Sequence, residues 1–181
     1  MNWKIDDIFR FKVVVIGDAA VGKTSIIRKY SLNQFSENYK MTVGADFNVK
    51  VVKFKDLGEV SLTIWDFGGQ EKFEEIRRYY YYGAHAAIIV FDITNRDSFN
   101  NIKKWLTDLQ SEVGNIPYLI LANKSDLQDD RQVSKSEIDQ LSDDLKIKIF
   151  DTSAKTGDNI EKAFYEIAKE CLSAYNIQFQ T

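Results

Sequence analysis

Residues 17–24, with the sequence GDAAVGKT, constrain the fold more than any other feature of the chain. They match the pattern G-x-x-x-x-G-K-[ST], in which glycine lets backbone amides come close to the oxygens of a polyphosphate. Residues 11–16 before the loop form an apolar run typical of a buried strand, and residues 25–32 after it have the pattern of a helix. The anion would then lie at the positive N-terminal end of that helix. The sequence therefore predicts an α/β fold with a phosphate site at this turn.

Two side chains at the end of this loop are suited to phosphate chemistry. Lys23 is expected to neutralise charge on the β- and γ-phosphates, and the Thr24 hydroxyl is expected to ligate Mg²⁺. A chance glycine turn is the weaker interpretation, because Gly, Lys and Thr have the required spacing between a strand and a helix. The predicted nucleotide contacts in this region are Asp18, Ala19, Ala20, Val21, Gly22, Lys23, Thr24 and Ser25.

Strand-like and helix-like segments alternate along the whole chain, with no internal repeat. Strands are predicted at residues 11–16, 43–55, 60–66, 86–92, 118–123 and 148–151, and helices at 23–32, 71–81, 98–113, 135–145 and 160–174. Residues 86–91 and 118–122 are continuously apolar, as expected of strands that are buried on both faces. A short turn with Gly58 joins the second and third strands as a hairpin. We therefore predict a six-stranded, mostly parallel sheet with one antiparallel strand and helices on both faces.

The third predicted strand ends in the sequence DFGGQ at residues 66–70. Asp66 is placed to hold Mg²⁺ through water, and Gly69 would let a backbone amide reach a γ-phosphate. Gln70 could orient an attacking water, since its neutral amide both accepts and donates hydrogen bonds. An aspartate followed by two glycines is also a common turn, but the phosphate-binding loop upstream favours the catalytic interpretation.

The fifth predicted strand ends in the sequence NKSD at residues 123–126. The Asp126 carboxylate can accept hydrogen bonds from guanine N1–H and from its exocyclic amine, whereas adenine would leave the carboxylate unpaired, at a cost of about 1–3 kcal/mol or more. The stem of Lys124 can pack along the base, and Asn123 can tie neighbouring loops together. The sequence SAK follows the last strand as Ser153, Ala154 and Lys155, and could supply a backbone amide to guanine O6. These residues together predict guanine selectivity.

Composition limits the class of protein further. The 181 residues are 44% hydrophobic and 28% charged, as in ordinary globular domains, and the net charge of −3 argues against a nucleic-acid partner. Cys171 is the only cysteine, which excludes an internal disulfide, fits a reducing cytosol, and predicts a small buried residue in a helix. No run approaches the roughly 18 apolar residues of a membrane span. The ends show no signal peptide, no myristoylation glycine and no prenylation cysteine. We expect a cytoplasmic protein that either is never lipidated or has a lipidated tail missing from this chain, and only in the second case would it reach membranes, peripherally.

The motifs together resemble the Ras superfamily of small GTPases, and the resemblance covers nearly the whole chain. Residues 42–47 (TVGADF), 62–66 (LTIWD), 70–73 (QEKF) and 90–94 (VFDIT) are most similar to the Rab branch. The resemblance implies a single P-loop G domain over residues 1–181, with residues 1–10 as an N-terminal extension. It implies a GTP-binding switch that hydrolyses GTP to GDP, with Gln70, Lys23 and Thr42 as catalytic residues. Thr42 would reach Mg²⁺ only in the GTP state, Phe35 would stack on guanine, and Tyr39 would close over the phosphates.

Partner binding follows from the same resemblance. Contacts of Thr42 and Gly69 with a γ-phosphate would order two loops, switch I and switch II, and hydrolysis would release both. Effectors, an exchange factor and an activating protein would then recognise a monomer by these loops. We expect an exposed aromatic patch at Phe47, Trp65 and Tyr80 to take part, the alternative being that these rings belong to the core.

The chain departs from the Rab pattern at several positions. Phe67 and Gly68 replace the usual Thr-Ala, and Gly-Gly-Gln instead resembles Arf-like proteins, Gα subunits and Roc domains. Ala19 occupies a position where Ras carries glycine, and its methyl group could obstruct Gln70 or an arginine finger and slow hydrolysis.

Some residues receive ordinary structural assignments. Arg77 and Arg78 are expected on a solvated face of switch II, and His85 at a strand edge or on the surface. Three alternatives to a Rab-like switch stay open at this point. They are an Arf-like or Roc-like GTPase, a P-loop ATPase or kinase, and a scaffold that binds nucleotide with little turnover.

Overall fold

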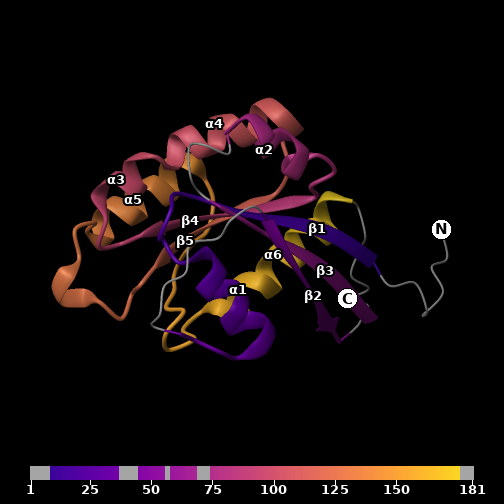
Figure 1. Cartoon of the computed structure of the whole chain (residues 1–181), viewed down its shortest axis with the longest axis horizontal. Helices are drawn as coiled ribbons and strands as arrows, with labels where there is room; N and C mark the ends of the chain where they lie inside the picture. Colours follow the sequence, from indigo (N-terminus) through magenta and orange to yellow (C-terminus); the bar gives the residue numbers. More distant parts are fainter. Residues whose placement is uncertain (1–8, 37–44, 56–57, 69–73, 176–181) are drawn as a thin grey trace.

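The computed structural model describes residues 9–36, 45–55, 58–68 and 74–175. In this part of the chain, six strands form one sheet in the order β2-β3-β1-β4-β5-β6 (Figure 1). The strands are β1 (Phe9–Ile16), β2 (Ala45–Phe54), β3 (Gly58–Phe67), β4 (Ala86–Asp92), β5 (Tyr118–Asn123) and β6 (Ile149–Asp151). The helices are α1 (Lys23–Leu32), α2 (Glu74–Tyr81), α3 (Arg96–Asn100), α4 (Ile102–Val113), α5 (Lys135–Leu145) and α6 (Ile160–Ala174), and a 3₁₀ turn, η2, spans Gln128–Asp130.

The strand directions confirm the predicted topology. β1 pairs in parallel with β3 and β4, and the pairs β4–β5 and β5–β6 are also parallel. β2 runs antiparallel to β3 as the expected hairpin, with Phe54 opposite Gly58. The carboxyl ends of β1, β3, β4, β5 and β6 therefore lie at one edge of the sheet, where ligands of such folds bind.

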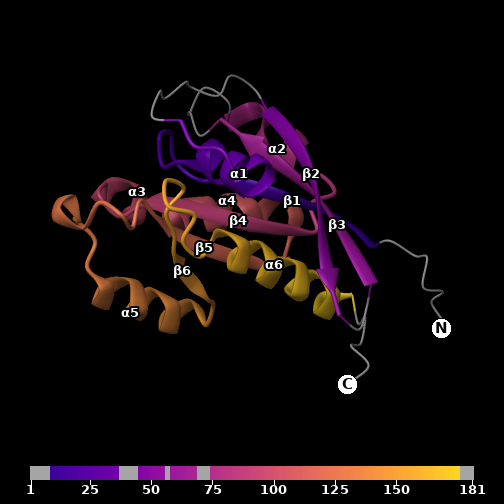
Figure 2. The ribbon, with the colours of Figure 1, turned by 90° about the horizontal axis from the view of Figure 1, so that it is seen from below.

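Helices cover both faces of the sheet. α1 and α6 lie on one face, and α2, α3, α4 and α5 on the other (Figure 1). The last four residues of β1 are apolar because both faces of the strand are covered: Val13 and Val15 enter the core under α1 and α6, whereas Val14 and Ile16 enter the opposite core. Seen from the side of α1 and α6, β2 and β3 lie at one end of the sheet and β6 with α5 at the other (Figure 2). Cys171 is buried in α6, as expected.

The helix predicted at residues 98–113 is divided in two. The Asn95 side chain accepts hydrogen bonds from the amides of Asp97 and Ser98, and so caps a short α3 that begins at Arg96. Asn101 then separates α3 from α4. The Asn101 side chain donates a hydrogen bond to Asp18, a residue 83 positions away. A local sequence pattern gives no sign of this long-range contact, so the sequence predicts a single helix here.

His85 links β1 to the start of β4. Its backbone amide donates to the Lys12 carbonyl at 2.8 Å, and its Nδ1 accepts from the Lys12 amide at 3.0 Å. Its ring also contacts Phe11 and Tyr175, so the prediction of a strand-edge position is correct. Burial, helped by the charge of Lys12, lowers the pKa of His85.

This contact predicts a pH dependence of stability. Because the folded pKa of His85 lies below that of the unfolded chain, the unfolded state binds more protons, and the free energy of unfolding falls as the pH drops below about 6.5. The expected loss is a few tenths of a kcal/mol, since the ring is partly exposed and partly screened. Urea unfolding at pH 7.0 and 5.5 should show a larger decrease in wild type than in His85→Gln, and equal decreases would contradict the prediction.

Candidate nucleotide-binding site

The phosphate-binding loop connects β1 to α1 at the carboxyl edge of the sheet, and two positions in it accept only glycine. Gly17 has a φ of 136°, and a Cβ there would lie 2.1 Å from the Val90 carbonyl oxygen of β4. Gly22 has a φ of 100°, and a Cβ there would lie 2.3 Å from Asn123 Nδ2. The loop is thus packed directly against the ends of β4 and β5.

Ala20 lies in the same loop with a φ of 65°, in the left-handed region that disfavours a Cβ. An alanine in this conformation costs on the order of 1 kcal/mol. The sequence motif places Ala20 at the predicted nucleotide site but gives no sign of this strain.

Lys23, the first residue of α1, is buried against the loop. Its Nζ donates to the carbonyl oxygens of Gly17 at 2.7 Å and Asp18 at 2.6 Å. Burial lowers the pKa of Lys23 to about 8, although the carboxylates of Asp66 and Asp18 oppose this effect. A buried ammonium with a lowered pKa gains from any anion that approaches it. The site therefore favours a negatively charged ligand in front of the loop.

Thr24 and Asp66 form the part of the site that fits Mg²⁺. The Thr24 hydroxyl donates to Asp66 Oδ2 at 2.5 Å, and Asp66 is buried near the end of β3. Burial raises the pKa of Asp66, while the Thr24 hydrogen bond and Lys23 oppose the rise. The other carboxylate oxygen, Oδ1, is buried and has no hydrogen-bond partner among the described residues. A hydroxyl beside a carboxylate oxygen that lacks a partner is a donor set that a hard cation prefers.

Nothing else in the described residues offers a cage for a metal. Within these ranges, there is no group of three or more His, Cys, Asp or Glu side chains that could hold an ion. Mg²⁺ does not need one, because it usually binds one or two protein oxygens together with waters and substrate phosphates. The Thr24–Asp66 pair therefore fits Mg²⁺ better than a structural metal.

Asn123 joins three loops at the end of β5. Its Nδ2 donates to the Val21 carbonyl at 2.8 Å, and its Oδ1 accepts from the Thr152 hydroxyl at 3.4 Å. The Ser125 amide also donates to the Thr152 carbonyl at 2.9 Å. The phosphate-binding loop, the NKSD segment and the SAK segment are thus connected to one another through buried hydrogen bonds.

Asp126 is exposed beyond β5, with one oxygen held in place. The Ser153 hydroxyl donates to Asp126 Oδ1 at 2.5 Å and accepts from the Thr156 amide at 3.1 Å. Lys124 has a left-handed φ of 66°, and its Nζ forms an ion pair with Asp92 Oδ2 at 2.5 Å. The arrangement presents an oriented carboxylate next to the phosphate-binding loop.

The remaining predicted residues fall into two groups. Ser25 lies in the first turn of α1, Ala154 is buried after β6, and Lys155 is exposed. Phe35, beyond the end of α1, is 39% exposed. Tyr39, Thr42, Gly69 and Gln70 lie outside the described residues, so their predicted roles stay predictions.

The Asp18 side chain makes contacts that the sequence analysis did not foresee. Its carboxylate accepts from Asn101 Nδ2 and from Trp105 Nε1, both at 2.7 Å. Two strong donors from α4 and its cap thus hold this carboxylate, and the Asp18 backbone carbonyl contacts Lys23. No local sequence signal links Asp18 to residues more than 80 positions away.

Arg77 corrects another expectation. The prediction placed Arg77 and Arg78 together on a solvated face, but Arg77 is only 3% exposed, whereas Arg78 is exposed. The Arg77 guanidinium lies 4.4 Å from the centre of the Trp105 ring and forms an ion pair with Asp108. The spacing of four residues between Arg77 and the buried Tyr81 is the signal that could have placed Arg77 on the inner face of α2.

The three rings predicted as an exposed aromatic patch contact one another, but only Phe47 is exposed, whereas Trp65 and Tyr80 are half-buried. Phe47 on β2 is 62% exposed, and its ring centre lies 5.9 Å from that of Trp65 on β3. Trp65 is in turn 6.3 Å from Tyr80 of α2, and the Lys12 Nζ lies 4.2 Å above the Trp65 ring. Val49 and Val51 extend the exposed apolar surface along β2. Phe47 is thus the exposed ring of the group, while Trp65 packs in part against the core, as the alternative interpretation expected.

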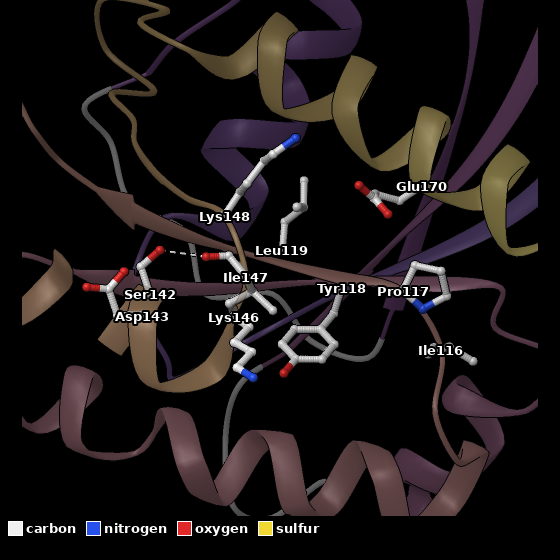
Figure 3. A pocket seen from close by; sticks show the side chains of 10 residues that line it. All are labelled: Ile116, Pro117, Tyr118, Leu119, Ser142, Asp143, Lys146, Ile147, Lys148 and Glu170. Carbon is white, nitrogen blue, oxygen red and sulfur yellow. Dashed lines mark hydrogen bonds between the residues drawn. The ribbon is translucent and has the colours of Figure 1, made fainter. Parts of the chain in front are cut away.

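A separate pocket of about 540 Å³ lies at the opposite, amino end of β5 and β6. Figure 3 shows Pro117 and Tyr118 toward one side of the pocket and Ser142 and Asp143 toward the other, with the Ser142 hydroxyl bonded to the Ile147 carbonyl. Since the motif residues all lie at the carboxyl ends of the strands, this pocket is not part of the nucleotide site.

The fold and the site define the protein as a P-loop nucleotide-binding protein. Residues 12–173 match the model of the Ras family. The chain is 38% identical over 169 residues to Ras-related protein Rab-8B of Homo sapiens, covering 93% of this chain and 81% of the relative. It is 42% identical over 169 residues to Ras-related protein Rab-7L1 of Rattus norvegicus, covering 90% and 82%. It is also 42% identical over 163 residues to Ras-related protein Rab-1 of Theileria parva, covering 89% and 74%.

The chain therefore belongs to the Ras family and is Rab-like. It is a small GTPase, a GTP-binding switch that hydrolyses GTP to GDP, and the Arf-like, ATPase and scaffold alternatives are not favoured. Ras-family GTPases bind guanine nucleotides, typically with Mg²⁺, and act through effectors and regulators. Within the described residues, no helix is both long and apolar enough to cross a membrane.

Proposed function

We propose that this chain is a magnesium-dependent switch of the Rab type that acts in membrane trafficking, with residues 1–181 forming one G domain. The observation that carries the proposal is the meeting of three motifs at one edge of the sheet. The buried hydrogen bond between Asn123 and Val21 joins the NKSD segment to the phosphate-binding loop. The bond between Thr24 and Asp66 joins that loop to β3.

The phosphate end of the nucleotide belongs in front of Lys23. The Lys23 ammonium would turn from its two carbonyl partners toward the β- and γ-phosphates. Thr24 and Asp66, joined by Thr42 in the GTP state, would hold Mg²⁺, which neutralises charge on the phosphate oxygens when it is bound. Gln70 would orient the attacking water, and the Gly69 amide would contact the γ-phosphate.

The base belongs at the NKSD and SAK segments. Asp126 would accept from guanine N1–H and from the exocyclic amine, with Ser153 fixing the orientation of the carboxylate. Lys124, Ala154 and Lys155 would line the base, and Phe35 and Tyr39 would cover it and the phosphates. Asn123 supports this region through its bonds to both neighbouring loops.

Partner binding is proposed at switch I, at switch II and at the patch of Phe47, Trp65 and Tyr80. The exposed Phe47 ring on β2 contacts the half-buried Trp65 of β3, which contacts Tyr80 of α2, so an effector bound at Phe47 would meet one aromatic group that spans these elements. The protein would act as a cytoplasmic monomer, controlled by an exchange factor and an activating protein. It would associate with membranes peripherally.

Nucleotide binding by the stripped protein tests this proposal. After nucleotide removal, calorimetry should show tight, Mg²⁺-dependent binding of GDP and at least 100-fold weaker binding of ADP, because Asp126 discriminates between the bases. Equal affinity for the two nucleotides would overturn the assignment of Asp126. Affinity for GDP that is unchanged by EDTA would overturn the assignment of Thr24 and Asp66.

Ala19 leads to a prediction about hydrolysis. Ala19 lies in the phosphate-binding loop, where its exposed methyl group would face Gln70 or an arginine finger. We expect Ala19→Gly to raise the single-turnover hydrolysis rate about tenfold, a change of about 1.4 kcal/mol in the barrier. A matched Ala174→Gly substitution at the end of α6 should leave the rate unchanged. A hydrolysis rate of Ala19→Gly equal to that of wild type would show that the Ala19 methyl group does not slow hydrolysis.

A further inference from the structure

Two side chains on the inner face of α2 share one carboxylate on α4. Arg77 Nη1 donates to Asp108 Oδ2 at 3.3 Å, and the Tyr81 hydroxyl donates to the same oxygen at 3.0 Å. Burial and the negative charge of Asp108 raise the pKa of Tyr81, so the hydroxyl keeps its proton and donates. Arg77 and Tyr81 are one helical turn apart on α2. Together they fix the position of α2 along the axis of α4.

The same face of α4 holds the phosphate-binding loop. Trp105, one turn before Asp108, has its ring covered by the Arg77 guanidinium and donates through Nε1 to Asp18. The Asp18 carbonyl in turn accepts from Lys23 Nζ at 2.6 Å. A continuous series of contacts therefore runs from α2, through Arg77 and Trp105, to the lysine of the phosphate site.

A buried arginine at this position is poorly explained by stability alone. Removing an ion pair from water costs about as much as the pair returns, so an apolar pair of similar volume would serve the core as well. The planar guanidinium, however, can cover an indole and reach a carboxylate at the same time, which the point charge of a lysine cannot do. The site also senses this charge, since Arg77 contributes to lowering the pKa of Lys23.

We propose that Arg77 is a positioning residue for GTP hydrolysis, which acts by fastening α2 to the phosphate-binding loop through Trp105. Gln70 precedes the first residue of α2, Glu74, by four positions in the sequence. The place where α2 is held therefore limits where Gln70 can reach relative to the loop. A misplacement of about 1 Å in such an arrangement can cost up to 100-fold in rate.

The test compares single-turnover GTP hydrolysis in preloaded variants, at a temperature well below their thermal midpoints. Arg77→Met keeps the apolar stem and removes the guanidinium, and we expect a rate about tenfold lower. The matched control is Arg78→Met, which removes the same charge from the exposed neighbour and should stay within twofold of wild type. Arg77→Lys keeps the charge beside Asp108 but leaves the indole uncovered, so it should restore thermal stability more fully than rate.

Trp105→Phe separates positioning from a purely structural role. This variant keeps a ring for Arg77 to cover but removes the Nε1–H that binds Asp18. In a double-mutant cycle, Arg77→Met should cost less than threefold in rate when Trp105→Phe is already present, because the route is already broken. Additive effects on the rate would overturn the proposal, as would a lowered thermal midpoint with an unchanged rate in Arg77→Met.

If Arg77→Met does not fold, Asp108→Asn replaces it. We expect Asp108→Asn to lower the hydrolysis rate about threefold, and a rate within twofold of wild type would contradict the proposal.

Discussion

Replacing Asp126 with asparagine is expected to weaken GDP binding by roughly 10³-fold and to make xanthosine diphosphate the preferred ligand. The carboxylate offers two acceptors to guanine N1–H and to the exocyclic amine, whereas an asparagine offers one acceptor and one donor. The donor would then face the guanine amine and leave both groups unpaired. Xanthine carries a carbonyl oxygen at that position, which accepts from the asparagine amide.

The controls for this experiment come from the same region. Asp129→Asn makes the same chemical change at an exposed position of the turn η2, and should leave both affinities as in wild type. Ser153→Ala removes the hydroxyl that orients Asp126 Oδ1, and is expected to weaken GDP binding by about tenfold without favouring xanthosine. Calorimetry with both nucleotides on wild type and on each variant gives these affinities. Equal weakening of GDP and xanthosine diphosphate in Asp126→Asn would show that this residue does not contact the base.

The sheet was predictable because burial on both faces leaves a strong local signal. β4 spans Ala86–Asp92, the same residues as predicted, and each of its side chains is buried. β2 lies at the sheet edge with an alternating, half-exposed sequence, and it ends at Phe54, one residue before the predicted end, while the predicted start at residue 43 lies outside the described residues. The fixed spacings of the phosphate-binding loop and of the NKSD motif likewise allow the nucleotide site to be predicted, because the backbone conformations that these motifs require are local.

What the sequence did not show depends on contacts between distant residues. One hydrogen bond joins the Asn101 side chain, at the break between α3 and α4, to the Asp18 carboxylate. The burial of Arg77 depends on Asp108 and Trp105, which lie on another helix about 30 residues away. An arginine next to an arginine suggests solvent unless its partners are known, so this part of the site required the structure.

The lowered pKa of Lys23 implies that nucleotide binding takes up a proton. In the free protein the pKa of Lys23 is about 8, and a bound polyphosphate must raise it, because a nearby negative charge favours the ammonium. The bound state therefore holds more protons than the free state above pH 8, and affinity falls as the pH rises through this value. Between pH 7 and pH 9, the dissociation constant for GDP should rise roughly tenfold, up to the limit of one proton per site.

Lys23→Met identifies the group responsible. We expect this variant to bind GDP at least 100-fold more weakly at pH 7, since it loses a charge-assisted contact with the phosphates. We also expect its affinity to change between pH 7 and pH 9 only as far as the nucleotide's own titration requires. Lys103→Met, on an exposed face of α4, should keep both the affinity and the pH dependence of wild type.

Proton uptake can be measured directly by calorimetry at pH 8 in two buffers with different ionisation enthalpies. Wild type should take up about half a proton per GDP, and Lys23→Met should show no uptake attributable to position 23. Equal proton uptake by wild type and Lys23→Met would place the titrating group elsewhere, and Lys23 would then meet the phosphates as an ammonium that is already fully charged in the free protein.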